Sequence, residues 1–490
     1  MATESIGETP TLFLRKATGL VRGWSVRDSI IYAALATNFV TLGIYEFTFA
    51  GPAFPKGQMI TSIVISGVLV SFLVIAYAGL VVTIPRAGGD YVWQTRILGS
   101  GLGFVMAATG WWFILWLWAP IYGNILAVQL FQPLWATLKW TWPGGGAVWF
   151  GSHTGVFVVT VITIALAGVL VSIGMAGYAR IQRWCFLGGL IAFAVIAVLL
   201  LTHSQADFIS SFNAQAHKLF GVNNAYGATQ AAAAKDGFVA PKLGFGPLGP
   251  TLLLAAHTFG WAFYQQSNAT SFAGNQPLPI WPYPVLFAGW LIHNTAVQVI
   301  LILAMSLWFF GWVGTLFLSS TRVIFAAAFD RVLPDRAAEV SEKRKVPVYS
   351  LILMLLPAVA LAAVYSYNGT FRTYTLDATL VIAVTYFFSA IAVVILPWRK
   401  PDLWAASPAS RIKVLGVPIV PLAGWVTIAF LGFDLYEWLT NGNYFVNNKG
   451  SLVYMGAMYV LGIVIYLTAR FVRARQGIDL GLINKEIPVE

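Results

Sequence analysis

Two long apolar segments of this sequence contain polar residues or glycine near their middle. Residues 35–52 read LATNFVTLGIYEFTFAGP, where Thr41 and Gly43 interrupt the run. Residues 252–275 read LLLAAHTFGWAFYQQSNATSFAGN, with Gly260 at a comparable place. A helix that unwinds at such a point can hold a carboxylate with its N–H groups and an ammonium group or a cation with its carbonyls. The alternative is that both glycines are small residues at helix contacts, which are common in membranes.

Glu46 is the ionisable residue nearest to the first interruption. It lies about one helical turn beyond Gly43. Ionisable groups within membrane segments are functional candidates by default, so Glu46 could carry a proton or meet a substrate ammonium group. The alternative is that it faces an external vestibule and is simply solvated.

The composition identifies the class of protein that must position these residues. Hydrophobic residues make up 58% of the chain and charged residues 10%, whereas about one quarter of a soluble domain is charged. The net charge of +11 then reflects basic cytoplasmic loops and not nucleic-acid binding. The single cysteine, Cys185, excludes an internal disulfide. We find no phosphate loop, metal-ligand cluster or nucleophile–base pair, and therefore expect no enzyme activity and no resident cofactor.

Apolar runs of about 20 residues, enough to span a bilayer, recur along the whole chain. They predict helices near residues 29–50, 60–83, 102–134, 154–174, 184–203, 249–273, 347–366, 376–396, 415–440 and 451–471. Arginine and lysine concentrate in alternate connections, which predicts that both termini are cytoplasmic. We therefore expect a multi-pass protein of the cell membrane, in contact with lipid, with no cleavable signal peptide.

Two segments carry motifs. The first is IPRAGGDYVWQTRILGSGLGF, residues 84–104, and the second is SSTRVIFAAAFDRVLPDRAAEVSEKRKVP, residues 319–347. The first resembles the Pro-Arg-Ser-Gly-Gly-x-Tyr motif of the amino acid–polyamine–organocation superfamily of permeases. The second resembles the superfamily motif Ser-Arg-x-x-Tyr-Ala-x-Ala-x-Asp-Gly-x-Leu-Pro, with Arg322, Asp330 and Leu333-Pro334 in register. Arg331 stands where the superfamily usually has glycine.

The resemblance implies the fold of the bacterial leucine transporter, an all-α membrane protein of about 12 helices. Two inverted repeats of five helices, with helices 1 and 6 broken at mid-membrane, are followed by two further helices. The expected regions are a cytoplasmic tail at 1–28, the first repeat at 29–203, an external loop at 204–248, the second repeat at 249–396, helices 11 and 12 at 397–471, and a cytoplasmic tail at 472–490.

The same resemblance places the substrate at the two helix breaks. In helix 1 the site falls on Asn38, Thr41, Gly43, Ile44 and Tyr45, although the first glycine of the usual break is absent. In helix 6 it falls on Thr258, Phe259, Gly260 and Trp261, with Tyr264 as a further aromatic gate residue. The implied function is secondary active transport of amino acids or related organic cations by alternating access.

Coupling to Na⁺ or H⁺ is also implied. Ser319 and Ser320 match the place where sodium-coupled relatives supply hydroxyl ligands, and the segment expected for helix 5 contains no lysine that could replace the ion. Together with Glu46 these serines are the coupling candidates. Two adjacent serines are, equally, ordinary small packing residues.

Residues 274–330 are too short for the two crossings that the scheme requires. Either helices 7 and 8 form a compressed hairpin that turns near Trp308–Trp312, or one span is missing from the sequence. The segment PYPVLFAGWLIHN resembles part of the external segment between those helices more than a helix 7. A missing span favours an alternative function, that of a non-transporting membrane subunit or sensor that keeps the permease fold. The sequence identifies no protein partner.

Overall fold

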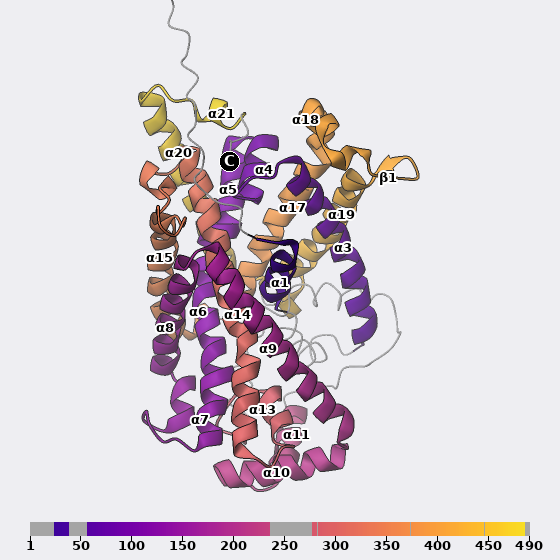
Figure 1. The fold of residues 1–490 in the computed structure, drawn as a ribbon, viewed down its shortest axis with the longest axis vertical. Coiled ribbons are helices and arrows are strands. Elements are labelled where there is room, and N and C mark those ends of the chain that lie inside the picture. The colour runs from indigo at the N-terminus through magenta and orange to yellow at the C-terminus, as the bar shows by residue number, and fades with distance from the viewer. Residues whose placement is uncertain are drawn as a thin grey trace, which may run out of the picture.

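The computed structural model describes residues 24–38, 56–235, 277–281, 283–372, 374–444 and 446–485 (Figure 1). The helices of the first half are α1 (Val26–Thr37), α3 (Met59–Thr83), α4 (Asp90–Ile97), α5 (Ser100–Ala108), α6 (Leu115–Leu126), α7 (Gln132–Leu138), α8 (His153–Ser172), α9 (Met175–Thr202), α10 (Gln205–Phe220) and α11 (Ala225–Lys235). Two π-helical turns, η1 (Thr109–Phe113) and η2 (Ala127–Phe131), join α5, α6 and α7, and a 3₁₀ turn, η3 (Gly146–Gly151), precedes α8.

The second half is also helical. Its elements are α13 (Pro284–Gly289), α14 (Thr295–Phe329), η4 (Asp335–Ala338), α15 (Val348–Tyr367), α16 (Gly369–Arg372), α17 (Thr375–Arg399), α18 (Pro401–Ala406), η5 (Pro408–Arg411), α19 (Ile419–Thr440), η6 (Gly442–Tyr444), α20 (Lys449–Arg475) and α21 (Leu480–Ile483). A hairpin of β1 (Lys413–Val414) and β2 (Val417–Pro418) precedes α19.

Nine helices among the described residues are long and apolar enough to cross a bilayer. They are α3, the continuous run from α5 to α7, α8, α9, α14, α15, the run from α16 through α17, α19 and α20. The predicted all-α polytopic membrane fold is confirmed. The apolar runs explain this outcome, because a helix satisfies every backbone hydrogen bond within itself and can therefore lie in lipid.

The helix ends gather at two faces of the bundle. The basic face is where α3, α8, α14, α17 and α20 end, and it carries α4, α18 and α21 (upper part of Figure 1). The opposite face carries α7, α10, α11 and α13 (lower part of Figure 1). Most arginines and lysines of the described connections lie at the basic face, so the positive-inside rule predicts that this face is cytoplasmic.

The prediction for helix 5 was wrong at its start. We expected the helix to begin near residue 184, but α9 begins at Met175, directly after a tight turn at Gly174 with φ 90°. Arg180 and Arg183 are therefore inside the helix and not in a loop. Charged residues near a helix end can keep their charge at the membrane surface, so they do not by themselves end a helix.

Helix 11 begins later than predicted. We expected its start near residue 415, but Leu415 and Gly416 form the turn of the β1–β2 hairpin, with φ 51° and 82°. The helix α19 begins at Ile419. Leu415 is almost fully exposed at this turn, which shows that apolar character alone does not place a residue in a span.

The compressed hairpin is not formed. Residues Thr295–Phe329 are one continuous helix, α14, and Trp308 and Trp312 are buried in its interior. The alternation of basic connections would place the preceding turn, AGNQPLPIWPYP, at the basic face, although the turn itself contains no basic residue. Its described residues instead lie at the opposite face, where the backbone N–H of Trp281 donates to the side chain of Gln132 at 3.0 Å.

The predicted external loop contains two helices, α10 and α11. Phe212 of α10 lies at the centre of this platform, with ring-centroid distances of 6.1 Å to Tyr226, 5.0 Å to Phe287 and 5.1 Å to Trp290. The chain therefore leaves the opposite face at Lys235 and is found at the same face again at residue 277. Among the described residues, no helix fills the place expected for helix 7.

Candidate functional site

The residues predicted to bind substrate fall largely outside the described part of the chain. Thr41, Gly43, Ile44, Tyr45 and Glu46 of helix 1 do so, as do Thr258, Phe259, Gly260, Trp261 and Tyr264 of helix 6. Asn38, Ser319 and Ser320 are described. The site can therefore be built from the elements that surround the two interrupted segments.

The first of these elements, α1, stops part of the way through the membrane. It has 12 residues, which correspond to about 18 Å of helix against a hydrocarbon core of about 30 Å. Its C-cap, Asn38, is left-handed with φ 48° and ψ 50°, and is fully buried. Asparagine tolerates this conformation better than most residues and commonly ends helices in it.

The other end of α1 is anchored at the basic face. A capping box between Ser25 and Asp28 starts the helix. The carboxylate of Asp28 accepts two hydrogen bonds from Arg183 of α9, at 2.5 and 2.7 Å. The indole N–H of Trp24 donates to the carbonyl of Met175 at 2.9 Å. The guanidinium of Arg183 holds the pKa of Asp28 well below its usual range, so this carboxylate is ionised at neutral pH.

A third contact joins α1 to α14. The hydroxyl of Tyr32 lies 3.0 Å from Ser319 Oγ and 3.2 Å from the carbonyl oxygen of Thr315. Ser319 Oγ also donates to the Thr315 carbonyl at 3.0 Å. Three oxygen atoms from two helices therefore converge here, directly below the left-handed end of α1.

These residues fit a sodium ion only in part. Ser320, the second predicted ligand, is fully buried and its hydroxyl donates to the Leu316 carbonyl of its own helix at 3.0 Å. Adjacent residues of a helix point about 100° apart, so Ser319 and Ser320 do not share the oxygen cluster. Tyr32, which the sequence analysis did not name, occupies the second position instead.

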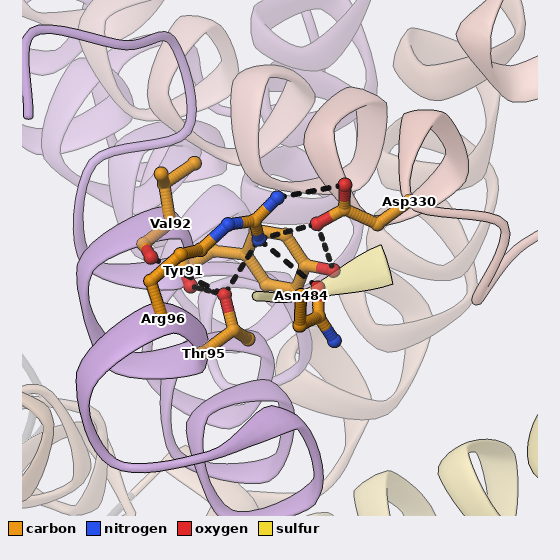
Figure 2. Close-up of polar contacts among 6 residues, drawn as sticks. All are labelled: Tyr91, Val92, Thr95, Arg96, Asp330 and Asn484. Carbon is orange, nitrogen blue, oxygen red and sulfur yellow. Dashed lines mark hydrogen bonds and ion pairs between the residues drawn. The ribbon is translucent and has the colours of Figure 1, made fainter. Parts of the chain in front are cut away.

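The two sequence motifs meet at the basic face in a buried ion pair (Figure 2). Arg96 of α4 donates to both oxygens of Asp330, at 2.5 and 2.8 Å, and both side chains are at most 2% exposed. Tyr91 donates to Asp330 at 3.0 Å, and Asn484 beside α21 accepts from Arg96 at 3.1 Å. Arg96 and Asp330 are 234 positions apart in the sequence, and their ion pair fixes α4 against the end of α14.

Arg331 departs from the family motif at a position where the backbone requires it to adopt φ 63°. Glycine adopts this conformation without steric cost, which explains the usual glycine of the motif. Here the carbonyl of Arg331 accepts a hydrogen bond from Arg473 of α20 at 2.9 Å. The turn is therefore kept, and α20 holds it.

The tryptophans of helix 3 are mostly packing residues. Trp112 and Trp118 are buried, and Trp118 stacks on Tyr122 at 5.8 Å. Trp111, in the π-helical turn η1, instead contacts Tyr386 of α17 with centroids 5.7 Å apart. Turns of π-helix recur at functional sites.

Comparisons with known proteins agree with this arrangement. A family model described as amino acid permease matches residues 275–469. The chain is 21% identical to the branched-chain amino acid permease of Lactococcus lactis subsp. cremoris, over 88% of this chain and 90% of the relative. It is 24% identical to the large neutral amino acids transporter small subunit 2 of Mus musculus, over 76% of this chain and 69% of the relative. With both motifs in place on an all-α membrane fold, these matches support the resemblance to the amino acid–polyamine–organocation superfamily of permeases.

Proposed function

We propose that this amino acid transporter is a secondary active permease that works by alternating access. The observation that carries the proposal is the short α1, which is anchored at the basic face and ends in a left-handed residue inside the membrane. A helix end at that depth leaves carbonyl groups without partners in their own helix. Such groups, with the N–H groups of a facing half-helix, can bind the ammonium and carboxylate groups of an amino acid.

The substrate in this proposal is a large neutral amino acid. The relatives carry the printed names branched-chain amino acid permease and large neutral amino acids transporter. The predicted residues that would contact the side chain are apolar or aromatic, namely Ile44, Tyr45, Phe259, Trp261 and Tyr264. Glu46 is the one charged residue among the predicted site residues, and we assign it to coupling. No charge is then left to select a basic or an acidic substrate side chain.

The described conformation is closed at the basic face in this reading. Opening requires α1 to leave α9 and α14, which breaks the Asp28–Arg183 pair and the Tyr32–Ser319 contact. The polar contacts that have to break are few, so a modest difference in substrate binding free energy between the closed and open conformations suffices to shift the equilibrium between them. The joint of Arg96 with Asp330 lies elsewhere and holds α4 to α14 throughout the cycle.

Uptake into proteoliposomes tests the function. We expect saturable uptake of labelled leucine, competed by other large neutral amino acids and stimulated by an inward Na⁺ or H⁺ gradient. Gly43→Leu and Gly260→Leu should abolish uptake while the amount of folded protein is kept. Gly67→Leu is the matched control, because a side chain at Gly67 on α3 meets open space.

The lack of a helix 7 among the described residues favours the second candidate, a membrane subunit or sensor without transport. Both described flanks of residues 236–276 lie at the opposite face, and two spans of about 20 residues each would take that whole interval. This candidate predicts that leucine binds, or that nothing binds, without any counterflow. Saturable exchange of internal for external leucine excludes it, whereas binding without exchange excludes transport.

A further inference from the structure

A second buried carboxylate of the first motif, Asp90, has a different environment from Asp330. Asp90 is the first residue of α4 and is 6% exposed at the basic face. Its Oδ1 accepts a hydrogen bond from the hydroxyl of Tyr77 of α3 at 2.5 Å and another from the hydroxyl of Ser389 of α17. One carboxylate oxygen therefore joins the neighbouring helices α3 and α4 to α17, which is about 300 residues further along the chain.

A second set of hydrogen bonds fixes this geometry. Gln94 of α4 donates to Ser389 Oγ and to the Thr385 carbonyl, both at 2.9 Å. Thr385 Oγ1 lies 2.9 Å from the carbonyl of Met106 in α5. Gln94, Thr385 and Ser389 are fully buried. The hydroxyl of Ser389 is thus positioned in advance to donate to Asp90, so the site is a rigid cradle on the α17 side.

Among the described residues, no lysine, arginine or histidine forms an ion pair with Asp90. Arg96 and Tyr91 of the same helix are directed at Asp330 instead, and Arg86 bonds to the Pro85 carbonyl. Tyr77 from α3 faces Asp90 directly, and Tyr386 from α17 faces Tyr77 with centroids 5.4 Å apart. Burial without a counter-charge raises the pKa of Asp90 above its ordinary value.

The contact with Asp90 is important for α3 because that helix has few other polar joints. Most of α3 presents apolar side chains outward, and its close approach to α19 at Gly79 is made against the side chain of Val420. At the basic face, the described side-chain bonds that hold it are Tyr77–Asp90 and the hydroxyl contact of Thr83 with Ser407 at 2.7 Å. A change at Asp90 therefore changes how firmly α3 is attached.

We propose that Asp90 is a proton-binding site whose occupancy controls the attachment of α3 to α4 and α17. The proposal rests on the transport function proposed above and names the proton as the coupling ion. The proton comes from water at the basic face, binds a carboxylate oxygen of Asp90, and returns to water when it is released. No other bond forms or breaks except hydrogen bonds.

The two protonation states differ in the strength of the joint. An ionised carboxylate accepts hydrogen bonds that are roughly twice as strong as those to a neutral group. The ionised form therefore holds Tyr77 and Ser389 together, and the protonated form loosens α3. In the sequence, α3 follows the interrupted segment that is predicted to bind substrate, so in this proposal the release of α3 is passed to that segment.

The first test needs no transport. A pH-difference infrared spectrum of the purified protein should show a carboxyl band that titrates at higher pH than an exposed aspartate, because burial raises the pKa of Asp90. The band should be absent in Asp90→Asn, shifted in Asp90→Glu and unchanged in Asp402→Asn, an exposed carboxylate on the same face. The proposal is overturned if every titrating carboxyl band of the wild type is still present in Asp90→Asn.

The second test uses the pH dependence of leucine uptake at a fixed Na⁺ concentration. A single coupled proton predicts that the rate changes about tenfold per pH unit beyond the pKa of the site. We expect Asp90→Asn to flatten this pH dependence, whatever its absolute uptake rate. Asp90→Glu should show a pH dependence shifted along the pH axis, and Asp402→Asn should keep the wild-type slope. A wild-type slope in Asp90→Asn overturns the coupling. If the wild type transports no amino acid, the proposed function fails, and the infrared titration still decides proton binding.

Discussion

The ion pair between Arg96 and Asp330 yields a stability prediction with a defined magnitude. Asp330→Asn leaves the guanidinium of Arg96, which is 5% exposed, without its carboxylate. Removing one partner of a buried pair costs about 3–5 kcal/mol, because the remaining charge is buried without compensation. At about 2 °C per kcal/mol for a large chain, the midpoint of thermal unfolding should fall by about 6–10 °C.

The double variant Arg96→Met/Asp330→Leu separates the charge effect from the loss of packing. It leaves no buried charge, and the remaining penalties fall on neutral groups: the Tyr91 hydroxyl loses its acceptor and the Asn484 side-chain oxygen loses its donor, at about 1–3 kcal/mol for a buried unsatisfied group. The double variant should therefore unfold at a higher temperature than Asp330→Asn alone, although one more residue is changed.

The matched control lies on the same face. Asp335 pairs with Arg473 at 3.1 Å, but its side chain is 79% exposed, and exposed pairs contribute about 1 kcal/mol or less. The measurement is the unfolding midpoint of each purified variant in one detergent, followed by intrinsic fluorescence. If Asp330→Asn shifts the midpoint no more than Asp335→Asn, or if the double variant is the least stable, the pair is not buried as described.

The remaining predictions concern the attachment of α1 to α9, the oxygen cluster of Tyr32 and Ser319, and helix packing at Gly123. Asp28→Asn should make Cys185 react with a maleimide several-fold faster. This buried cysteine lies beside Gly311 and Leu35, where α1 meets α9 and α14, so loosening α1 exposes it. An unchanged labelling rate would show that the Arg183 contact does not hold α1. The folded-state pKa of Asp28 is lowered, so its contribution to stability is complete above the unfolded value of about 3.9 and is lost as the pH falls below it. The ratio of the Asp28→Asn labelling rate to the wild-type rate should therefore fall toward one in that acid range, since the loss of thiolate is common to both proteins. Tyr32→Phe and Ser319→Ala should each weaken any stimulation of leucine uptake by Na⁺, while Ser320→Ala should leave it unchanged. An equal loss in Ser320→Ala would instead favour Ser319 and Ser320 as the ion ligands, as predicted from the sequence. Gly123→Leu should abolish recovery of folded protein in size-exclusion chromatography, because a Cβ there would lie 2.3 Å from Thr160 Cα, whereas Gly67→Leu should elute normally.

The spans were the most predictable part of the fold. The helices α3, α8, α15 and α17 begin and end within a few residues of their predicted limits, because each is an apolar run bounded by polar residues. The start of α9 was missed because Arg180 and Arg183 read as loop residues. What keeps Arg183 in a helix is the carboxylate of Asp28, 155 residues earlier, and no local pattern contains that information.

The candidate site was predictable in part. The resemblance indicated both motifs, but it did not indicate that Arg96 would select Asp330 while Asp90 would select Tyr77 and Ser389. Periodicity also could not decide between one helix and two over residues 295–329, since an apolar run long enough for a hairpin is also long enough for one tilted span. The Ser25–Asp28 capping pattern was the available signal for the anchored start of α1.

The short helix α4 explains how one motif can serve two purposes. Asp90 and Arg96 are six residues apart, which places their side chains about 120° apart around the helix axis. Arg96 therefore faces α14 and α21, while Asp90 faces α3 and α17. On the first side, the carboxylate and the guanidinium neutralise each other's charge. On the second side, a carboxylate that accepts hydrogen bonds from the hydroxyls of Tyr77 and Ser389 changes charge when a proton binds. A permanent joint and a titratable joint on the same eight-residue helix allow α3 to be released while α4 stays fixed to the end of α14.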